Sequence, residues 1–249
     1  MLDCNIRWGY NIDDEKERKV SKMLYLIDTA NIDAIKKCCE FYPIAGVTTN
    51  PTIVSKEKTD FKNLIYSIRE IIGDRKMLHV QTTATEAEEM LKEAKMIKSV
   101  VGGDFYLKIP ITKEGLKGTK LCKDAGINVT MTAIFTQPQA LIAANAGADF
   151  VAPYINRLDN IVSDGVNVVR EIVDIFKEYN ISTKVLAASF KNVEQVHKVS
   201  VTGAQAVTIN PDLFDMLIYH PLTYYAIDDF CKDWETVYGD AKVSDLLTK

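Results

Sequence analysis

The 249-residue chain lacks several features that define large classes of proteins. It has no apolar run long enough to span a bilayer, so we expect no membrane protein. It has no block of lysines and arginines, and its net charge is −4, so we expect no nucleic-acid partner. Residues 1–22 have no signal-peptide apolar core, because charged side chains occupy all of residues 13–19. These absences favour a protein of the cytoplasm.

Cysteine and histidine are scarce and have no ligand-like spacing. The five cysteines are odd in number and include no C-x-x-C pair: Cys4, Cys38, Cys39, Cys122 and Cys231. A disulfide framework is therefore not expected, and a reducing compartment fits. The histidines are His79, His197 and His220. Because they match no metal-binding spacing, we interpret them as structural and expect neither a metal nor a cofactor.

From residue 23 onward, short apolar segments alternate with stretches of helical period. The predicted strands are 24–27, 45–48, 77–81, 105–110, 128–132, 150–154, 184–188 and 206–209. One of the predicted helices spans 161–179, where apolar residues recur every three to four positions. Repeated βα units of this kind predict an α/β fold, a (β/α)8 TIM barrel. We expect residues 23–249 to form one catalytic domain with an extra C-terminal helix, preceded by an N-terminal extension over residues 1–22.

An open doubly wound sheet is the alternative fold. Such sheets usually carry a glycine-rich phosphate-binding loop after the first strand. Here the first predicted strand is followed by Asp28-Thr29-Ala30-Asn31, which contains no glycine. The barrel is therefore favoured.

Lys108 interrupts an otherwise apolar predicted strand, Phe105-Tyr106-Leu107-Lys108-Ile109-Pro110. Burial lowers the pKa of a lysine, and a neutral lysine can form a Schiff base with a carbonyl substrate. The alternative is a lysine that extends to water or pairs with a carboxylate. Polar residues also occur at the other predicted strand ends: Asp28, Asn50, Gln81, Thr132, Tyr154 to Arg157, Ser189 and Asn210. In a barrel these ends meet at one face, so the set predicts Schiff-base chemistry there.

Four segments together resemble the transaldolase family, and most closely its short branch, the fructose-6-phosphate aldolases. The segments are 45–53 (AGVTTNPTI), 108–110 (KIP), 152–159 (APYINRLD) and 187–191 (AASFK). The resemblance covers residues 23 to about 239. It implies a barrel whose fourth strand carries the Schiff-base lysine, which is the position of Lys108.

The resemblance also implies roles for the residues around Lys108. Asp28 matches the aspartate that holds a substrate hydroxyl and assists proton transfer during C–C cleavage. Gln81 and Thr132 match residues that position a catalytic water. Tyr154 matches the general acid/base of the aldolase branch.

Four further positions match substrate-binding residues of the family. Asn50 matches the asparagine that binds a hydroxyl of the dihydroxyacetone portion. Arg157, Ser189 and Lys191 match the phosphate-binding positions. An arginine is well suited to clamp a phosphate, and a lysine contributes a point charge.

Two positions distinguish the branches of the family. Where this chain has Gln81 and Tyr154, transaldolases typically have glutamate and phenylalanine. The resemblance therefore implies an aldolase that reversibly cleaves fructose 6-phosphate into dihydroxyacetone and glyceraldehyde 3-phosphate. Thr130 and Phe135 depart from the pattern: transaldolases have asparagine at the first position and aldolases an apolar residue, and aldolases have tyrosine at the second.

Two other functions remain open. One is a transaldolase that moves the dihydroxyacetone unit from a ketose phosphate to erythrose 4-phosphate. The other is an inactive barrel that only binds sugar phosphates.

Several candidate residues also have structural interpretations. Asp28 could cap the helix that starts near residue 32, although Asn31 fits that role better. Asn50 precedes Pro51 and could simply mark a helix start. Ser189 could be a cap, and the Tyr154 hydroxyl could be a satisfied core group.

Aromatic residues cluster on the last predicted helix. They are Tyr224, Tyr225, Phe230, Trp234 and Tyr238. They could pack on the chain's own barrel. The resemblance implies instead that this helix contacts a neighbouring subunit in a homo-oligomer, a ring or a double ring such as a decamer.

Overall fold

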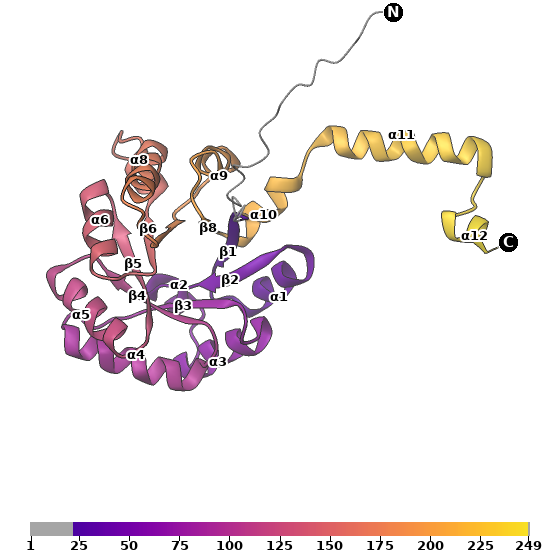
Figure 1. Cartoon of the computed structure of the whole chain (residues 1–249). Coiled ribbons are helices and arrows are strands. Elements are labelled where there is room, and N and C mark those ends of the chain that lie inside the picture. Colours follow the sequence, from indigo (N-terminus) through magenta and orange to yellow (C-terminus); the bar gives the residue numbers. More distant parts are fainter. Residues whose placement is uncertain (1–21, 249) are drawn as a thin grey trace, which may run out of the picture.

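The computed structural model describes residues 22–248 and shows one closed sheet in which each parallel strand pairs with the next and β8 pairs with β1 (Figure 1). The strands are β1 (Leu24–Asp28), β2 (Ile44–Thr48), β3 (Met77–Gln81), β4 (Phe105–Pro110), β5 (Asn128–Ile134), β6 (Phe150–Pro153), β7 (Lys184–Ala187) and β8 (Ala206–Ile209). The predicted (β/α)8 barrel is confirmed.

Helices follow the strands, and all but the last two lie around the outside of the barrel. They are α1 (Ile32–Phe41), α2 (Pro51–Lys56), α3 (Phe61–Ile72), α4 (Ala87–Val101), α5 (Lys113–Asp124), α6 (Gln137–Asn145), α7 (Ile155–Asp159), α8 (Gly165–Glu178), α9 (Val193–Ser200), α10 (Pro211–Ile218), α11 (Pro221–Tyr238) and α12 (Val243–Leu247). Asn31 caps α1 by accepting a hydrogen bond from the Ala34 amide, as the sequence favoured. Pro51 occupies the first position of α2, as predicted.

The core has two layers, because each strand is buried on both faces. The larger layer lies between the strands and the helices and includes Ile27, Val80, Leu107, Val129 and Val207. A smaller cluster comprises Leu26, Met77, Phe150, Leu186 and Ala206. The side chains of these five residues point into the barrel and fill its interior. The C-terminal end of the barrel is left for polar side chains.

Helix α5 packs closely on the end of β4 because residue 115 has no side chain. A Cβ atom at Gly115 would lie 2.1 Å from the carbonyl oxygen of Pro110. Pro110 is the last residue of β4, two positions after Lys108. The glycine therefore permits the contact that supports the strand carrying Lys108.

The predicted start of one helix is wrong. The sequence predicts a helix over 161–179, but α8 starts at Gly165. Ile161 and Val162 lie in the preceding turn and are 70% and 98% exposed. The helix starts where the Asp164 side chain accepts a hydrogen bond from the amide of Asn167, a cap that outweighs the apolar character of the two residues before it.

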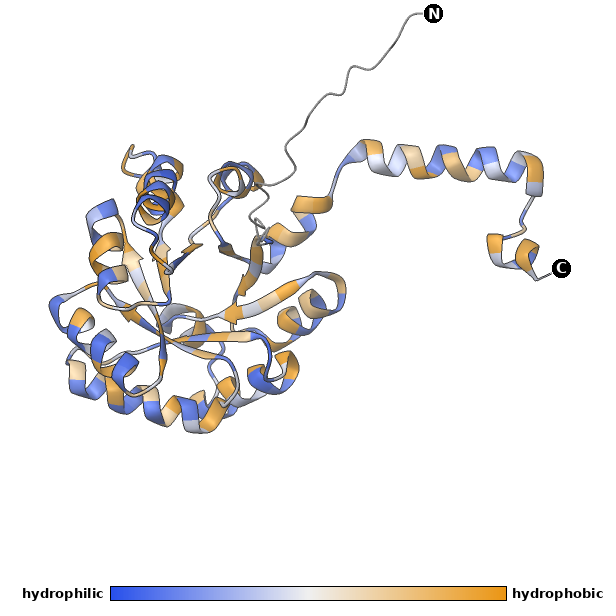
Figure 2. Cartoon of the chain, in the orientation of Figure 1, coloured by the Kyte–Doolittle hydropathy of each residue, from blue (hydrophilic) through white to orange (hydrophobic). Residues whose placement is uncertain are grey.

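The predicted C-terminal helix is present as α11, and it extends away from the barrel (Figure 1). None of its residues is buried, and Phe230 is 68% exposed. Figure 2 shows apolar residues distributed along this helix. The interpretation that the aromatic residues of this helix pack on the chain's own barrel is therefore wrong.

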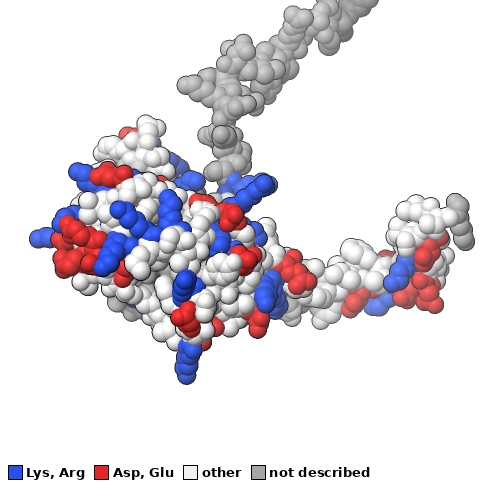
Figure 3. Space-filling model, turned by 90° about the horizontal axis from the view of Figure 1, so that it is seen from below, with Lys and Arg blue, Asp and Glu red and all other residues white. Residues whose placement is uncertain are grey.

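Three other expectations concern regions or surfaces outside the barrel core. Residues 1–21 of the expected N-terminal extension lie outside the described residues. Among the described helices, none is long and apolar enough to cross a membrane. On the face shown in Figure 3, basic and acidic side chains are interspersed.

Candidate active site

The predicted site residues converge on one cavity of about 480 Å³ at the C-terminal ends of the strands. Those that line it are Asp28, Asn50, Gln81, Lys108, Tyr154, Arg157, Ser189 and Lys191. Thr132 joins them through a hydrogen bond to Tyr154. Convergence is expected because every strand of a parallel barrel ends at the same face.

Lys108 is only 4% exposed, and within residues 22–248 it pairs with no carboxylate. Its Nζ atom donates a hydrogen bond of 2.9 Å to the backbone carbonyl of Thr49, just beyond β2. Because β3 lies between β2 and β4, the Lys108 side chain crosses the inner face of β3. The amine is thus enclosed by the barrel and still faces the cavity.

Asp28 is fixed by a chain of threonine hydroxyls inside the barrel. The Thr48 hydroxyl donates to Asp28 Oδ1 at 2.7 Å. The same Thr48 oxygen lies 2.7 Å from the hydroxyl oxygen of Thr208. Since Thr48 has only one hydroxyl proton, Thr208 is the donor of the second bond. The other carboxylate oxygen of Asp28 has no hydrogen-bond partner among residues 22–248 and can bind a ligand. Asn31, not Asp28, caps α1.

Tyr154 has a defined orientation at the end of β6. Its hydroxyl lies 2.9 Å from the Thr132 hydroxyl. The ring of Phe135 contacts it edge-on, with centroids 5.6 Å apart. The Arg157 guanidinium lies over its face, 5.0 Å from the ring centroid. These contacts hold the phenol in the cavity rather than in the apolar core, although its hydroxyl is satisfied.

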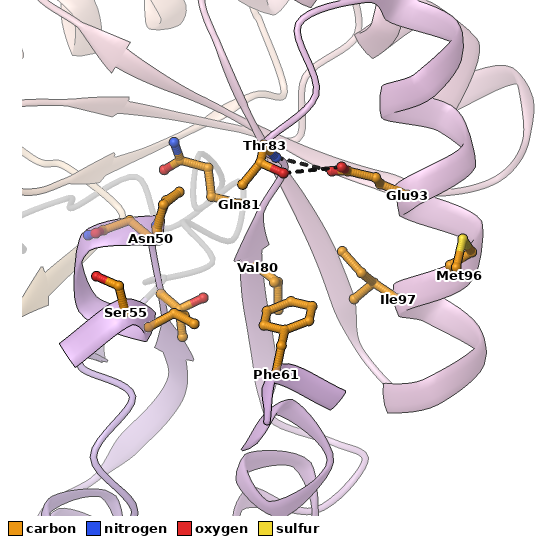
Figure 4. Close-up of a pocket in the computed structure, with 12 residues that line it drawn as sticks. Asn50, Ser55, Phe61, Val80, Gln81, Thr83, Glu93, Met96 and Ile97 are labelled. Carbon is orange, nitrogen blue, oxygen red and sulfur yellow. Dashed lines mark hydrogen bonds between the residues drawn. The ribbon is translucent and has the colours of Figure 1, made fainter. Parts of the chain in front are cut away.

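Gln81 lies between the active-site cavity and a second, mostly apolar cavity of about 430 Å³. Figure 4 shows Gln81 and Asn50 at the polar end of this second cavity, with Val80, Phe61 and Ile97 at the apolar end. The buried Oε1 atom of Gln81 has no partner among the described residues. A water or a substrate hydroxyl in the active-site cavity would satisfy it.

The backbone after Gln81 is anchored by Glu93 of α4. The Glu93 carboxylate accepts hydrogen bonds from the Thr83 amide at 3.1 Å and from the Thr83 hydroxyl at 3.2 Å (Figure 4). It also accepts one from the hydroxyl of Thr82. Glu93 therefore fixes the end of β3, where Gln81 enters the site.

Asn50 combines its structural and its predicted functional role. Its Oδ1 atom caps α2 by accepting a hydrogen bond from the Ile53 amide at 3.0 Å. Because the oxygen must face that amide, the NH₂ group points the other way and can donate to a ligand in the cavity.

The cationic side of the cavity is built from α7 and the loop after β7. The Ile155 and Asn156 amides donate to the carbonyls of Ala188 and Ser189, which joins the two segments. Ser189 has a φ of 66°, a left-handed conformation that is uncommon for serine and typical of functional turns. It caps no helix, because Asn192 caps α9.

Gln195 of α9 connects the segments that carry the two predicted phosphate ligands. Its side-chain oxygen accepts from the Lys191 amide at 2.8 Å, and its nitrogen donates to Asp159 at 2.6 Å. Asp159 ends α7, two residues after Arg157. Gln195 therefore holds the backbones of Arg157 and Lys191 in one arrangement.

Sequence reasoning missed Thr48, Thr208 and Lys56. The two threonines are buried and bonded in the Asp28 network, and Lys56 of α2 lines the cavity. Thr48 had no signal in the sequence, because it stands beside Asp28 only in the register of β1 and β2. Lys56 had no signal either, since an exposed lysine in a helix is ordinary.

Comparison with known proteins agrees with this geometry. The family model described as transaldolase/fructose-6-phosphate aldolase matches residues 25–245. The chain belongs to this family. A probable fructose-6-phosphate aldolase from Streptococcus pneumoniae is 40% identical over 89% of this chain and 100% of the relative. A probable transaldolase from Lachnoclostridium phytofermentans is 39% identical over 88% of this chain and 100% of the relative.

Solved structures outside the family share the fold. A dihydrodipicolinate synthase from Rhodopseudomonas palustris has a TM-score of 0.57 at 12% identity, covering 88% of this chain and 80% of that one. At this identity the likeness concerns the barrel alone. Membership of the transaldolase/fructose-6-phosphate aldolase family makes the protein an enzyme of the Schiff-base aldolase and transaldolase class.

Proposed function

We propose that the protein is a class I aldolase that reversibly cleaves fructose 6-phosphate into dihydroxyacetone and glyceraldehyde 3-phosphate. The observation that carries the proposal is the enclosed Lys108 amine, which faces a cavity shared with Asp28 and Tyr154. In the part of the chain that the structure describes, this amine has no carboxylate partner. An amine in this setting is suited to attack a ketone carbonyl.

The site residues can carry out each step of the cleavage. Lys108 adds to the substrate ketone, and loss of water from the carbinolamine gives an iminium ion. Asp28 accepts the proton of the C4 hydroxyl as the C3–C4 bond breaks, and the bonding electrons flow to the iminium nitrogen to give an enamine. Glyceraldehyde 3-phosphate leaves. Tyr154, with Thr132 and a water at Gln81, protonates C3 and supports hydrolysis of the imine to dihydroxyacetone.

The phosphate end of the substrate is assigned to Arg157, Lys191 and Ser189. Arg157 can bind phosphate oxygens with two parallel N–H donors, while Lys191 supplies a second positive charge. The Asn50 NH₂ group is placed to hold a hydroxyl of the dihydroxyacetone portion.

Gln81 and Tyr154 favour the aldolase over a transaldolase. After cleavage, an aldolase must protonate the enamine, and the Tyr154 hydroxyl is a proton donor near it. A transaldolase must instead preserve the enamine for a second aldehyde, erythrose 4-phosphate. The relatives carry both names, so the transaldolase is the second candidate. An inactive sugar-phosphate-binding barrel is the third.

One assay separates the three functions. Purified protein is incubated with fructose 6-phosphate without an acceptor aldehyde, and free dihydroxyacetone is measured. The aldolase releases dihydroxyacetone continuously. A transaldolase releases little until erythrose 4-phosphate is added and then forms a new ketose phosphate. An inactive barrel does neither.

We also propose that the protein acts in the cytoplasm as a homo-oligomer, a ring or a double ring such as a decamer, joined through α11. In support of this, α11 exposes Leu222, Tyr225, Phe230 and Val237, at 64% to 71% of their surface, and none of its residues is buried. An amphipathic helix is rarely stable in water without a partner surface.

A further inference from the structure

His79 is a buried polar side chain that the proposed reaction does not use. It lies on the inner face of β3, two residues before Gln81, and is fully buried. Its ring stacks on Tyr106 with centroids 4.5 Å apart and meets Phe150 edge-on at 5.5 Å. Its Nδ1 atom lies 2.8 Å from the hydroxyl oxygen of Thr130, which is also fully buried. Its Nε2 atom has no hydrogen-bond partner among the described residues.

This arrangement costs stability. A buried imidazole nitrogen without a partner loses its hydration and gains nothing in return, whereas an apolar pair at residues 79 and 130 would fill the same space without that loss. The pair therefore calls for an explanation other than packing.

The Lys108 side chain supplies one. On its way from β4 to the Thr49 carbonyl it crosses the inner face of β3, which carries His79 and Gln81. Gln81 stands directly opposite Lys108 in the strand register. Its Oε1 atom is, in the described part of the chain, the other buried polar side-chain atom without a partner. Both unpartnered atoms therefore belong to the strand that Lys108 crosses. Burial, and then the nearby charge of Lys108, hold the pKa of His79 well below its ordinary value, so the imidazole is neutral.

We propose that His79, oriented by Thr130, is a positioning residue that solvates the positive charge of the Lys108 imine from beneath, through Nε2 and one ordered water. The inference rests on the proposed function, because it requires the imine. A neutral imidazole whose Nδ1–H donates to Thr130 presents a lone pair on Nε2, which can accept a hydrogen bond from such a water. The water would bring polar contact to an iminium ion that the barrel otherwise removes from solvent.

The test replaces both members of the pair: His79→Phe with Thr130→Val. The matched control is Thr183→Val, which removes a buried hydroxyl that bonds to the Ala148 carbonyl at 2.7 Å and lies at the opposite end of the barrel. Two quantities are measured over a range of pH: the rate of borohydride trapping with dihydroxyacetone, and the melting temperature.

The double variant should fold with an unchanged or higher melting temperature, because no polar group of the pair remains unpaired. Its trapping rate should fall about tenfold, which is typical for loss of a hydrogen bond to a charged group. The acid limb of its trapping rate plotted against pH should move to lower pH. The reason is that phenylalanine and valine side chains solvate a protonated amine less well than an imidazole and its water do. Thr183→Val should trap like the wild type.

Other ionisable groups lie around Lys108 and His79, and they are common to all the variants. Those on the cavity are Asp28, Lys56, Tyr154, Arg157 and Lys191. Tyr106 stacks on the far side of the His79 ring, with Asp104 and Lys184 beyond it. The difference in trapping rate and pH dependence between the double variant and the wild type therefore measures the contribution of His79 and Thr130.

The outcomes separate the two proposals. If the wild type forms no trapped adduct, the proposed function fails. If it does, and the double variant traps at the same rate with the same profile, His79 is structural and the inference is overturned. Should the double variant not fold, His79→Gln and His79→Leu decide: glutamine keeps a polar group near the Nε2 position and should retain most of the rate that leucine loses. Equal rates would overturn the inference.

Discussion

The side chains around Lys108 are held by one another before any substrate binds. Asp28 is fixed through Thr48, and Tyr154 through Thr132. Each pair spans two strands, so the geometry of the site follows from the strand register. Such preorganisation allows the site to stabilise developing charge without rearranging during the reaction.

Replacing Tyr154 with phenylalanine removes one proton donor and keeps the ring. Release of free dihydroxyacetone from fructose 6-phosphate should fall about 100-fold, the size of a general acid contribution. Transfer to erythrose 4-phosphate should persist or rise, because the enamine then survives longer. Tyr66→Phe, at a tyrosine that is 51% exposed on α3, is the control. An unchanged ratio of release to transfer would contradict the role of Tyr154.

The burial of His79 predicts that acid weakens the fold. Because the pKa of His79 is lowered in the folded protein, the unfolded chain binds more protons as the pH falls below about 6.5. The free energy of unfolding should then decrease by up to about 1.4 kcal/mol per pH unit until the folded pKa is reached. Denaturant unfolding at several pH values measures this slope. His79→Phe with Thr130→Val should lose it, and a slope that the variant retains would contradict the assignment.

At the residue scale the sequence predicted where the site residues lie but not how they are bonded. The strand-end positions of Asp28, Lys108 and Tyr154 followed from the βα rhythm together with a few motifs. Thr48 and Thr208, which hold Asp28, were not predicted, because threonine is common in strands and only the cross-strand register gives it a partner. His79 was interpreted as structural because the histidines match no metal-binding spacing. Its place on the strand that the Lys108 side chain crosses follows only from the closed barrel.

At the element scale, close packing of α5 on β4 should couple stability to activity. Gly115→Ala would place a Cβ atom 2.1 Å from the Pro110 carbonyl oxygen, so the strand end or the helix must shift. We expect a loss of about 2 kcal/mol, as is usual for overpacking, and reduced turnover because Lys108 lies on the same strand.

Gly118→Ala is the matched control for that change. A Cβ atom there would meet the Met90 sulfur at 2.8 Å, at a flexible side chain that can move. Thermal unfolding and steady-state kinetics of the two variants make the comparison. Equal effects would show that the α5–β4 contact has no special importance for the site.

The sequence was most informative about elements whose period was unambiguous. The strands are short apolar runs, and all were placed within about two residues of their observed ends. The start of α8 was misplaced because Ile161 and Val162 continue the helical period although they lie in a turn. The extension of β5 to Ile134, with a φ of 58° at Ala133, was also not predicted, because local sequence does not determine such an irregularity.

At the scale of the whole molecule, α11 should be needed for assembly and not for folding of the barrel. Phe230→Glu places a charge at a 68% exposed apolar position and should dissociate the oligomer. Lys232→Glu, nearly on the opposite side of the same helix, should leave it assembled. Sedimentation velocity measures the association state, and circular dichroism checks folding. A wild-type protein that sediments as a monomer would contradict the proposed assembly.

The central claim is that Lys108 forms a covalent imine with the substrate, and its most direct test is reductive trapping followed by peptide mass analysis. Borohydride added with dihydroxyacetone should inactivate the protein and add the mass of one reduced three-carbon unit to the peptide that contains Lys108. The Lys108→Met variant should gain no mass. Labelling of a different lysine, or full activity after treatment, would contradict the account.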